Sequence, residues 1–544
     1  MGTILNHNLV KDITPNCKNL FGVALISSTL PTLLMALTPL LASTQEISGP
    51  LISPGHIRID ISTSYLHSDT RFGKRTDRYG SLIKEEEPLG FDFSDASVGT
   101  RIFPGLEVLE QNIKKAAGVE VEPFILGSSK AVITQSAVWL PIRIDIGISS
   151  WLSVGVMVPF SQRRAEVAST FNPSGANAGI TPSASDPIRV DNFLGELLAA
   201  EASLKNISKN LCSSNPSSSN CIESSALLAE SQEFQSAIVG AFTSHGVFPL
   251  EGTVTGNALQ YRVQTLMAAH QGLGVPFPNN IPLATELLNE GKYGNLITNP
   301  GYGVTGAPFS SWRSLWEMGD VELYANFRLW GSEQNDGEYR THSDINYQIG
   351  AGSLIRLGTG KVDLPENFID KGSGDGQNDL EVNLFGGLNV NRLGIWGEIR
   401  YGFSYSTLVP RRISSPDEAF PSLQTTQIVR WKPGNYLQLR LTPRFQLTDV
   451  MSVALDLTAF SKNMDSYESI STNSSSDVSL LELETGQDLL DIGIGVVYST
   501  LQNGKGRPTE ARLLLRRSVS GGGGLTPKMD RIEFGLRLFK KIWN

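Results

Sequence analysis

The 544-residue sequence is poor in charged residues, in cysteine and in long apolar runs. Charged residues make up 18% of the chain, against roughly 25% in soluble domains. No basic cluster is present, so we expect no binding of nucleic acid. After residue 42 no apolar run reaches the length of about twenty residues that a membrane-spanning helix needs, which excludes a helical membrane bundle.

Motifs of catalysis and of metal binding are also missing. The six histidines lack H-E-x-x-H spacing, and the sequence has no C-x-x-C pair, no G-x-S-x-G elbow and no Walker loop. His67-Ser68-Asp69 and the segment from Tyr339 to Asp344 place hydrolase-type residues side by side, but neighbours on an extended chain point to opposite faces. We therefore expect no enzyme activity, no cofactor and no metal.

Four acidic residues surround a Gly-rich loop: Asp370, Asp375, Asp379 and Glu381. Carboxylates beside glycines are able to bind calcium, but the spacing is not that of an EF-hand. Turn capping by the Asp side chains is the favoured interpretation.

The N-terminus has the pattern of an export signal. Two lysines precede an uncharged apolar run, residues 20–42, and small residues follow it. We expect residues 1–44 to be a signal peptide cleaved near Ala42 to Thr44. The run is long enough for a transmembrane anchor, but two prolines within it disfavour that alternative.

Period-two alternation dominates the rest of the chain. From Tyr436 to Leu447, leucine and phenylalanine alternate with glutamine, arginine and threonine, which gives a strand one apolar and one polar face. About twelve such segments of ten or more residues are present, the length of a tilted strand that crosses lipid. They are residues 56–67, 131–147, 152–163, 320–330, 345–357, 379–390, 393–406, 435–447, 450–461, 488–499, 509–518 and 530–541.

The connections between these segments alternate between long and short, up to a final one at 519–529. Outer-membrane barrels have short turns at one end and long loops at the other. The pattern predicts an all-β transmembrane antiparallel barrel, with first strands in 45–163 and the others in 320–544. A soluble sandwich is the alternative.

Aromatic residues near strand ends are candidates for interface girdles: Tyr65, Trp139, Trp151, Phe160, Trp330, Trp396, Tyr405, Trp431, Tyr498, Phe539 and Trp543.

Residues 164–319 interrupt the strand pattern and predict a helical external insertion, either a cap or a plug. Helical spacing of leucines predicts long helices over 190–211, with Asp191 as N-cap, and over 222–242. Shorter helices are expected at 258–270 and 282–289. Cys212 and Cys221 lie between the first two helices, and a disulfide there would contribute roughly 2–3 kcal/mol. The alternative to the disulfide is a pair of free thiols. The alternative to a cap or plug is a surface insertion without a role in transport.

Charged residues on the polar faces of the strands are the candidate lumen-lining residues. In a barrel of about twelve strands the interior is narrow, so these side chains either pair across the lumen or set a field for solutes. They are Arg58, Asp60, Arg143, Asp145, Glu322, Arg328, Glu398, Arg400, Arg440, Arg444, Asp456, Glu533 and Arg537.

Three segments share residue patterns with a known family. Asp145 to Phe160 combines a Gly-containing strand, a polar turn and an alternating strand that ends in Pro-aromatic; Gly319 to Trp330 has the pattern of a following strand. Gly358 to Gly360 and Gly372 to Leu380 supply a Thr-Gly turn and a Gly-rich loop. These segments resemble the outer-membrane transporter family named after phenol degradation, although Leu357 replaces a proline region and the insertion is larger.

The resemblance implies passive transport of small hydrophobic or aromatic compounds across the outer membrane of a Gram-negative-type bacterium. A polar-lined lumen, an apolar belt and the lack of an energy-coupling motif are consistent with that function. The implied partners are outer-membrane lipid, a small hydrophobic solute, and the export and barrel-assembly machinery. The alternatives are a structural or surface-recognition barrel plugged by its helical insertion and, less favoured, an outer-membrane hydrolase.

Overall fold

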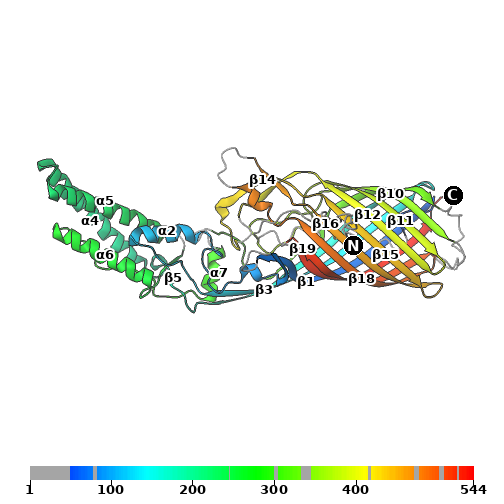
Figure 1. Ribbon diagram of the computed structural model, residues 1–544, viewed down its shortest axis with the longest axis horizontal. Helices are drawn as coiled ribbons and strands as arrows, with labels where there is room; N and C mark the ends of the chain where they lie inside the picture. The colour runs from blue at the N-terminus through cyan, green and yellow to red at the C-terminus, as the bar shows by residue number, and fades with distance from the viewer. Residues whose placement is uncertain are drawn as a thin grey trace, which may run out of the picture.

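Twelve antiparallel strands form one closed barrel, because β1 pairs with β20 on one side and with β3 on the other (Figure 1). The computed structural model describes residues 49–76, 82–243, 246–298, 304–331, 345–414, 418–470, 477–501, 508–523 and 526–543. The strands are β1 (His56–Thr76), β3 (Ser128–Gly147), β4 (Leu152–Asn172), β9 (Val321–Gly331), β10 (Asn346–Leu357), β11 (Asp379–Val390), β12 (Leu393–Ser404), β15 (Tyr436–Gln446), β16 (Met451–Lys462), β18 (Gln487–Ser499), β19 (Thr509–Gly522) and β20 (Thr526–Lys541). The predicted barrel is confirmed; the predicted signal peptide lies outside the described residues.

The two faces of the barrel wall have opposite polarity. Leu439 is 43% exposed on the outside, whereas the next residue, Arg440, is 5% exposed on the inside. Leu455 and Asp456 differ in the same way, at 41% and 1%. A soluble sandwich would bury the leucines between its sheets, so that alternative is wrong. The outward leucines and isoleucines form the apolar belt of a membrane-spanning barrel.

The ends of the barrel differ in the length of their connections. At the turn end, only Asn391 and Arg392 join β11 to β12, and both described chain ends meet there, since His56 pairs with Lys541. The opposite, loop end carries most of the long connections. One prediction for this end is wrong: β19 runs on to Gly522 and β20 begins at Thr526, so the last connection is short.

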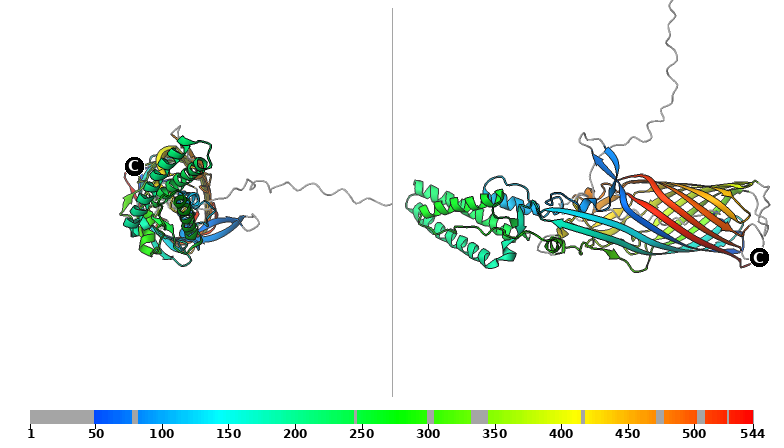
Figure 2. Two further views of the ribbon diagram at one scale, coloured as in Figure 1. Left: turned by 90° about the vertical axis from the view of Figure 1, so that its left-hand side faces the viewer. Right: turned by 90° about the horizontal axis from the view of Figure 1, so that it is seen from below.

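Three strands continue beyond the barrel at the loop end. The pairing of β1 with β3 stops at Ser68 and Gln135. From there β1 pairs with β2 (Leu82–Pro88) in a hairpin that stands out from the wall, while β3 continues beside β4 (Figure 2). The wall therefore forks between β1 and β3 at the rim of its loop end. The sequence predicted residues 131–135 of the β3 extension, but it ended the first strand at 67 and the third at 163. In β4 an apolar alternation runs on through Ala165, Val167 and Phe171, so a signal for that extension was available.

Helices extend the molecule at the loop end and lie beyond the barrel, outside its lumen (Figures 1 and 2). They are α2 (Leu106–Ala117), α3 (Pro182–Ser185), α4 (Pro187–Ser214), α5 (Ser219–Thr243), α6 (Val254–Gly272) and α7 (Glu290–Thr298). These helices, with the segments of 91–126 and 173–311 that join them, are called the cap below. None of the helices in the described part of the chain is long and apolar enough to cross a membrane.

The disulfide between Cys212 and Cys221 is present and joins α4 to α5, as predicted. Two other predictions for the cap are wrong. The N-cap of α4 is Asp186, whose side chain accepts a hydrogen bond from the Arg189 backbone, so the helix begins earlier than Asp191. Residues 282–289 are not helical; the helix there is α7, which begins at Glu290.

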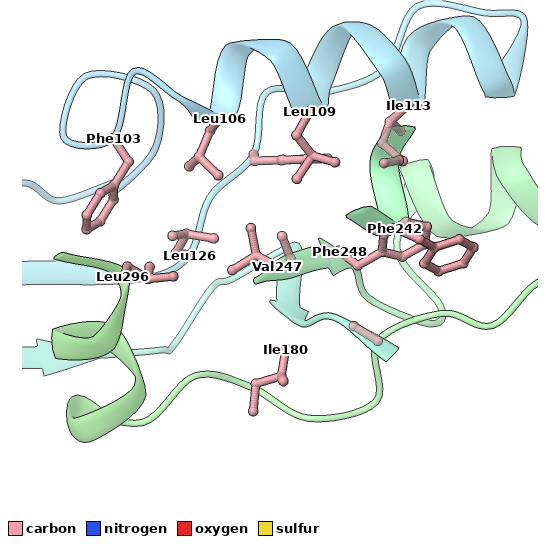
Figure 3. Close-up of a cluster of buried hydrophobic side chains, with 14 of the residues drawn as sticks. Phe103, Leu106, Leu109, Ile113, Leu126, Ile180, Phe242, Val247, Phe248 and Leu296 are labelled. Carbon is pink, nitrogen blue, oxygen red and sulfur yellow. The ribbon is translucent and has the colours of Figure 1, made fainter. Parts of the chain in front are cut away.

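One apolar core unites the cap. Leu106, Leu109 and Ile113 on α2 point toward Val247 and Phe248 (Figure 3). The last two residues belong to β6 (Val247–Pro249), which pairs with β5 (Ala178–Ile180). Further strands at the loop end are β7 (Trp312–Arg313), β8 (Glu317–Met318), β13 (Thr407–Arg412), β14 (Thr426–Lys432) and β17 (Ser466–Ser469), and the short 3-10 turns are η1 (Phe91–Phe93), η3 (Leu423–Thr425) and η4 (Val478–Leu481).

Phe420 connects the cap to the other long loops at the loop end. Its ring centroid lies 5.2 Å from that of Phe93, 5.5 Å from Phe103 and 5.4 Å from both Phe309 and Phe368. Phe368 belongs to the loop between β10 and β11, and Phe420 to the loop between β12 and β15. The aromatic cluster thus fixes the cap above the barrel mouth.

We predict that Phe420→Ala loosens the cap while leaving the barrel folded. Truncation of a buried Phe costs about 3–5 kcal/mol, and this ring contacts three rings of the cap, those of Phe93, Phe103 and Phe309. Limited proteolysis of the folded protein should cut the cap faster in the variant. Tyr261→Ala on α6, where the side chain is 73% exposed, is the matched control. Equal cleavage rates in both variants would contradict the assigned role.

Candidate functional site

The lumen at the turn end is filled by paired charges. The fully buried Asp145 accepts hydrogen bonds from Arg58 at 2.7 Å and from Arg143 at 2.9 Å, and also from the hydroxyl of Tyr324. The Arg143 guanidinium lies 4.0 Å from the centre of the Tyr324 ring. Gly155 makes room for this cluster, because a Cβ there would lie 2.5 Å from the Asp145 carboxylate.

A second cluster of charges crosses β1, β19 and β20. Asp60 accepts from Arg537 at 2.6 Å and from Arg512 at 3.3 Å. The same two arginines bind further carboxylates, Arg512 to Glu533 and Arg537 to Glu510, each at 3.1 Å. Each charge therefore faces opposite charges on neighbouring strands, which offsets the cost of removing it from water.

Two more clusters complete the polar lining. Midway along the barrel, Asp456 binds Arg440 at 2.9 Å and Arg516 at 2.7 Å. Toward the loop end of β9 to β12, Arg356 binds Glu322 and Asp379 at 2.9 and 3.1 Å.

Beside the Arg356 pairs, Arg400 binds Glu381 at 3.1 Å and Glu398 at 3.0 Å. The Tyr436 hydroxyl also donates to Glu381. Pairs of this kind hold neighbouring strands in one register, and their charges are largely compensated.

The structure places the predicted lumen residues on the inner face of the wall. Arg328, Arg400 and Arg444 are half-buried. The buried ones are Arg58, Asp60, Arg143, Asp145, Glu322, Glu398, Arg440, Asp456, Glu533 and Arg537. Sequence reasoning missed Arg512 and Arg516 because Leu514, 1% exposed, also points inward and merges with its outward neighbours into one leucine run. It also missed Arg356 on β10, whose alternation with apolar neighbours was a usable signal.

Toward the loop end, the other side of the lumen is apolar. Side chains from β1, β3, β15, β16, β18 and β20 pack in one buried cluster, called the apolar wall below: Leu66, Phe72, Trp139, Tyr436, Phe460, Leu489 and Met529. At this level the lumen therefore has one apolar side and, on β9 to β12, one ion-paired side.

Two tryptophans predicted as interface residues lie inside the barrel instead: Trp139 and Trp396, on the inner face of the wall, are 8% and 5% exposed. A third, Trp431, is 3% exposed because it is buried in the separate sheet of β13, β14 and β17. The exposed aromatic residues at the strand ends fit the girdle prediction; they are Tyr65, Trp151, Trp330, Tyr405, Tyr498 and Trp543.

The segment that precedes β1, residues 49–54, enters the lumen at the turn end. The Gly49 carbonyl accepts a hydrogen bond from Arg58 at 2.8 Å, and the Ile52 amide donates to the Ser153 hydroxyl at 2.9 Å. Leu51 packs against Phe385 and Trp396 on the inner face of β11 and β12. This N-terminal segment and the ion pairs together occupy the turn end of the lumen.

The acidic residues of the Gly-rich loop serve structural roles. Asp375 accepts from the Gln377 amide and Asp370 from the Leu364 amide, which is turn capping of the kind the sequence indicated. Burial and the neighbouring Asp379 raise the pKa of Asp375 to about 7. Among the described residues no group of three or more acidic, histidine or cysteine side chains is suited to a metal ion.

Of the two hydrolase-type segments, only His67-Ser68-Asp69 lies in the described part of the chain, and its three side chains form no hydrogen bond with one another. The hydroxyl of the buried Ser68 donates to the carbonyl of Thr70, on the same strand. The other hydrolase-type segment, 339–344, lies outside the described residues.

Comparisons with known proteins return structures but no family. No protein-family model and no curated protein matches the sequence. An outer-membrane channel from Pseudomonas putida F1 matches at 7% identity, over 92% of this chain and 100% of that one, with a TM-score of 0.40. The monoaromatic hydrocarbon channel CymD matches at 7%, over 91% and 90%, with 0.25. The Ralstonia pickettii toluene transporter TbuX matches at 8%, over 90% of each chain, with 0.25.

We predict that Asp145→Ala strongly destabilises the barrel. The variant leaves the guanidinium groups of Arg58 and Arg143 buried without their shared carboxylate, and breaking a buried pair costs about 3–5 kcal/mol. The temperature at which the folded band unfolds in detergent gels should fall. The control is Asp530→Ala, which breaks an exposed pair with Arg517 and should cost less than about 1 kcal/mol. Equal shifts in the two variants would show that Asp145 has no special role.

Proposed function

We propose that this protein is an outer-membrane barrel through which small hydrophobic or aromatic molecules pass without an energy source. The apolar wall is the observation that carries this proposal. A barrel that only supports the membrane has no need to line its lumen with aromatic and aliphatic side chains from six strands. An apolar solute entering below the cap meets these side chains and leaves water at little cost.

The ion pairs oppose the passage of such a solute at the turn end. Arg58, Asp145 and Arg537 are at most 1% exposed, so their level of the lumen is already filled by protein. The N-terminal segment lies at the same end and precedes the closed wall rather than forming part of it, so its release is the simplest way to open a path. The fork between β1 and β3 offers a second exit, sideways into lipid, at the rim of the apolar wall.

Uptake of an apolar dye by whole cells tests the function. N-phenyl-1-naphthylamine fluoresces in lipid and is excluded by an intact outer membrane. Cells that produce the protein should take up the dye faster than cells that do not. No difference, together with no conductance in planar bilayers, would favour the structural or surface-recognition barrel.

We predict that Phe460→Asp slows dye uptake by about tenfold. A carboxylate in the apolar wall binds water. An apolar solute that passes must displace this water, and the loss of hydration of the charge costs well over 1 kcal/mol of free energy. Phe460→Leu keeps the site apolar and is the matched control. Both variants are first checked for folding by their mobility in unheated gels. Wild-type uptake by a folded Phe460→Asp protein would remove the apolar wall from the route.

We predict that replacing both Leu51 and Ile52 by Ser raises the ion conductance of single barrels. The two side chains are buried, and the loss of their apolar contacts weakens the seating of the N-terminal segment by a few kcal/mol, by analogy with truncations of about 2–5 kcal/mol each. The control exchanges Leu51 for Met and Ile52 for Val. Unchanged conductance in the double-serine protein would mean that the ion pairs alone close the lumen.

A further inference from the structure

A pocket lies where the apolar wall meets the loop end of the barrel. The cavity itself is small, about 30 Å³, and opens beyond that into the lumen; it is bounded by β1, β3, β4 and the loop between β10 and β11. Leu66 and Met529 of the apolar wall line it together with Ala137, Trp312 and Ile369. The pocket is therefore a continuation of the proposed route for apolar solutes.

Two cations project into this apolar setting. The Lys371 ammonium lies 3.3 Å from the side-chain oxygen of Gln135, and no carboxylate of the described residues forms an ion pair with it. Arg163, which donates to the Lys371 carbonyl at 2.6 Å, pairs with Glu317. Burial and this guanidinium lower the pKa of Lys371 to about 7, the consequence of an ammonium without a counter-charge.

Several buried donors around the pocket lack acceptors. Arg163 is 4% exposed, and its Nε has no hydrogen-bond partner. One step deeper along the same pair of strands, where Trp139 pairs with Ser161, the indole nitrogen and the hydroxyl are likewise without partners. The Asp370 carboxylate interacts electrostatically with Arg163; its Oδ2 accepts from the Leu364 amide, and its Oδ1 is a buried acceptor without a partner. The three donors without acceptors outnumber this one oxygen, so the site is short of acceptors, and the positive charge favours an anionic one.

We propose that this pocket binds the anionic head group of a small amphipathic molecule, such as an alkyl or aryl carboxylate, with Lys371 and Arg163 as its ligands. The apolar tail would lie along Leu66, Ala137 and Met529. This inference rests on the proposed function and narrows it, because it adds a negative charge to the hydrophobic solute that the barrel handles. The anion supplies the negative counter-charge that the Lys371 ammonium lacks and the hydrogen-bond acceptor that Arg163 Nε lacks.

Calorimetric titration with octanoate tests the proposal, with the full-length protein in phosphatidylcholine nanodiscs and empty nanodiscs as blank. Octanol and octylamine carry the same tail with a neutral and a cationic head. We expect octanoate to bind at least tenfold more tightly than either. Equal binding of the three would overturn the anion site and indicate that ordered water alone meets the unpaired donors.

Variants assign the charge to its residue. Lys371→Met should weaken octanoate binding by about tenfold or more, the usual scale for a lost charged hydrogen bond, and Lys371→Arg should restore most of it. Lys130→Met, on β3 but with an exposed side chain, should bind octanoate like the wild type. An unchanged affinity in a folded Lys371→Met protein would overturn the assignment.

Two further measurements are needed. One distinguishes a free amphiphile from a lipid head group as the ligand, and the other distinguishes failure of the anion site from failure of the proposed transport function. Nanodiscs that contain phosphatidylglycerol should leave octanoate binding unchanged if the ligand is a free amphiphile, and should weaken it by competition if a lipid phosphate occupies the same anion site. Dye uptake by the wild type tests passage without any anion. Octanoate binding without dye uptake would overturn the proposed transport function and support the anion site. Dye uptake without octanoate binding would overturn the anion site and support the transport function.

Discussion

Closure of the hydrogen-bond ladder is the constraint on which the rest of this protein depends. Lipid offers no partner to a backbone amide or carbonyl, so strands that cross it must pair on both sides, and only a closed barrel satisfies all of them. Closure at twelve strands leaves an interior too narrow for a wide channel. Every inward side chain is then close to others, and a charge placed there needs its counter-charge within the same few strands, as Asp145 and Asp60 show.

The division of the lumen follows from that narrowness. At the turn end carboxylates and guanidinium groups neutralise one another, so they hold the wall together and leave little net field for a solute. On one side of the loop end, aromatic and aliphatic side chains take their place. The cap packs on Phe420 and covers this apolar region at the loop end of the barrel. Polarity thus changes along the barrel as well as across its wall.

Much of the barrel could be predicted because each strand faces lipid on one side and a mainly polar lumen on the other, and this imposes a period-two alternation on the sequence. All twelve strands were placed, and the two cysteines between helical stretches indicated their disulfide. The lumen was harder to predict. Leu514 and Trp139 are apolar residues that point inward, so alternation alone assigns them to lipid. The fork after Ser68, the N-terminal segment and the pocket around Lys371 depend on contacts between distant parts of the chain, which no local pattern contains.

The uneven satisfaction of charge indicates where selectivity would arise. A carboxylate such as Asp456, held by two arginines, gains little from a passing solute, because its hydrogen bonds are already made. Lys371 is in the opposite position: it lies in an apolar pocket beside another cation, and its ammonium is largely uncompensated. A molecule that brings both an apolar tail and a negative charge gains from the wall and from the ammonium together. A purely apolar molecule gains only from the first, and an ion without a tail only from the second, so the combination selects amphipathic anions.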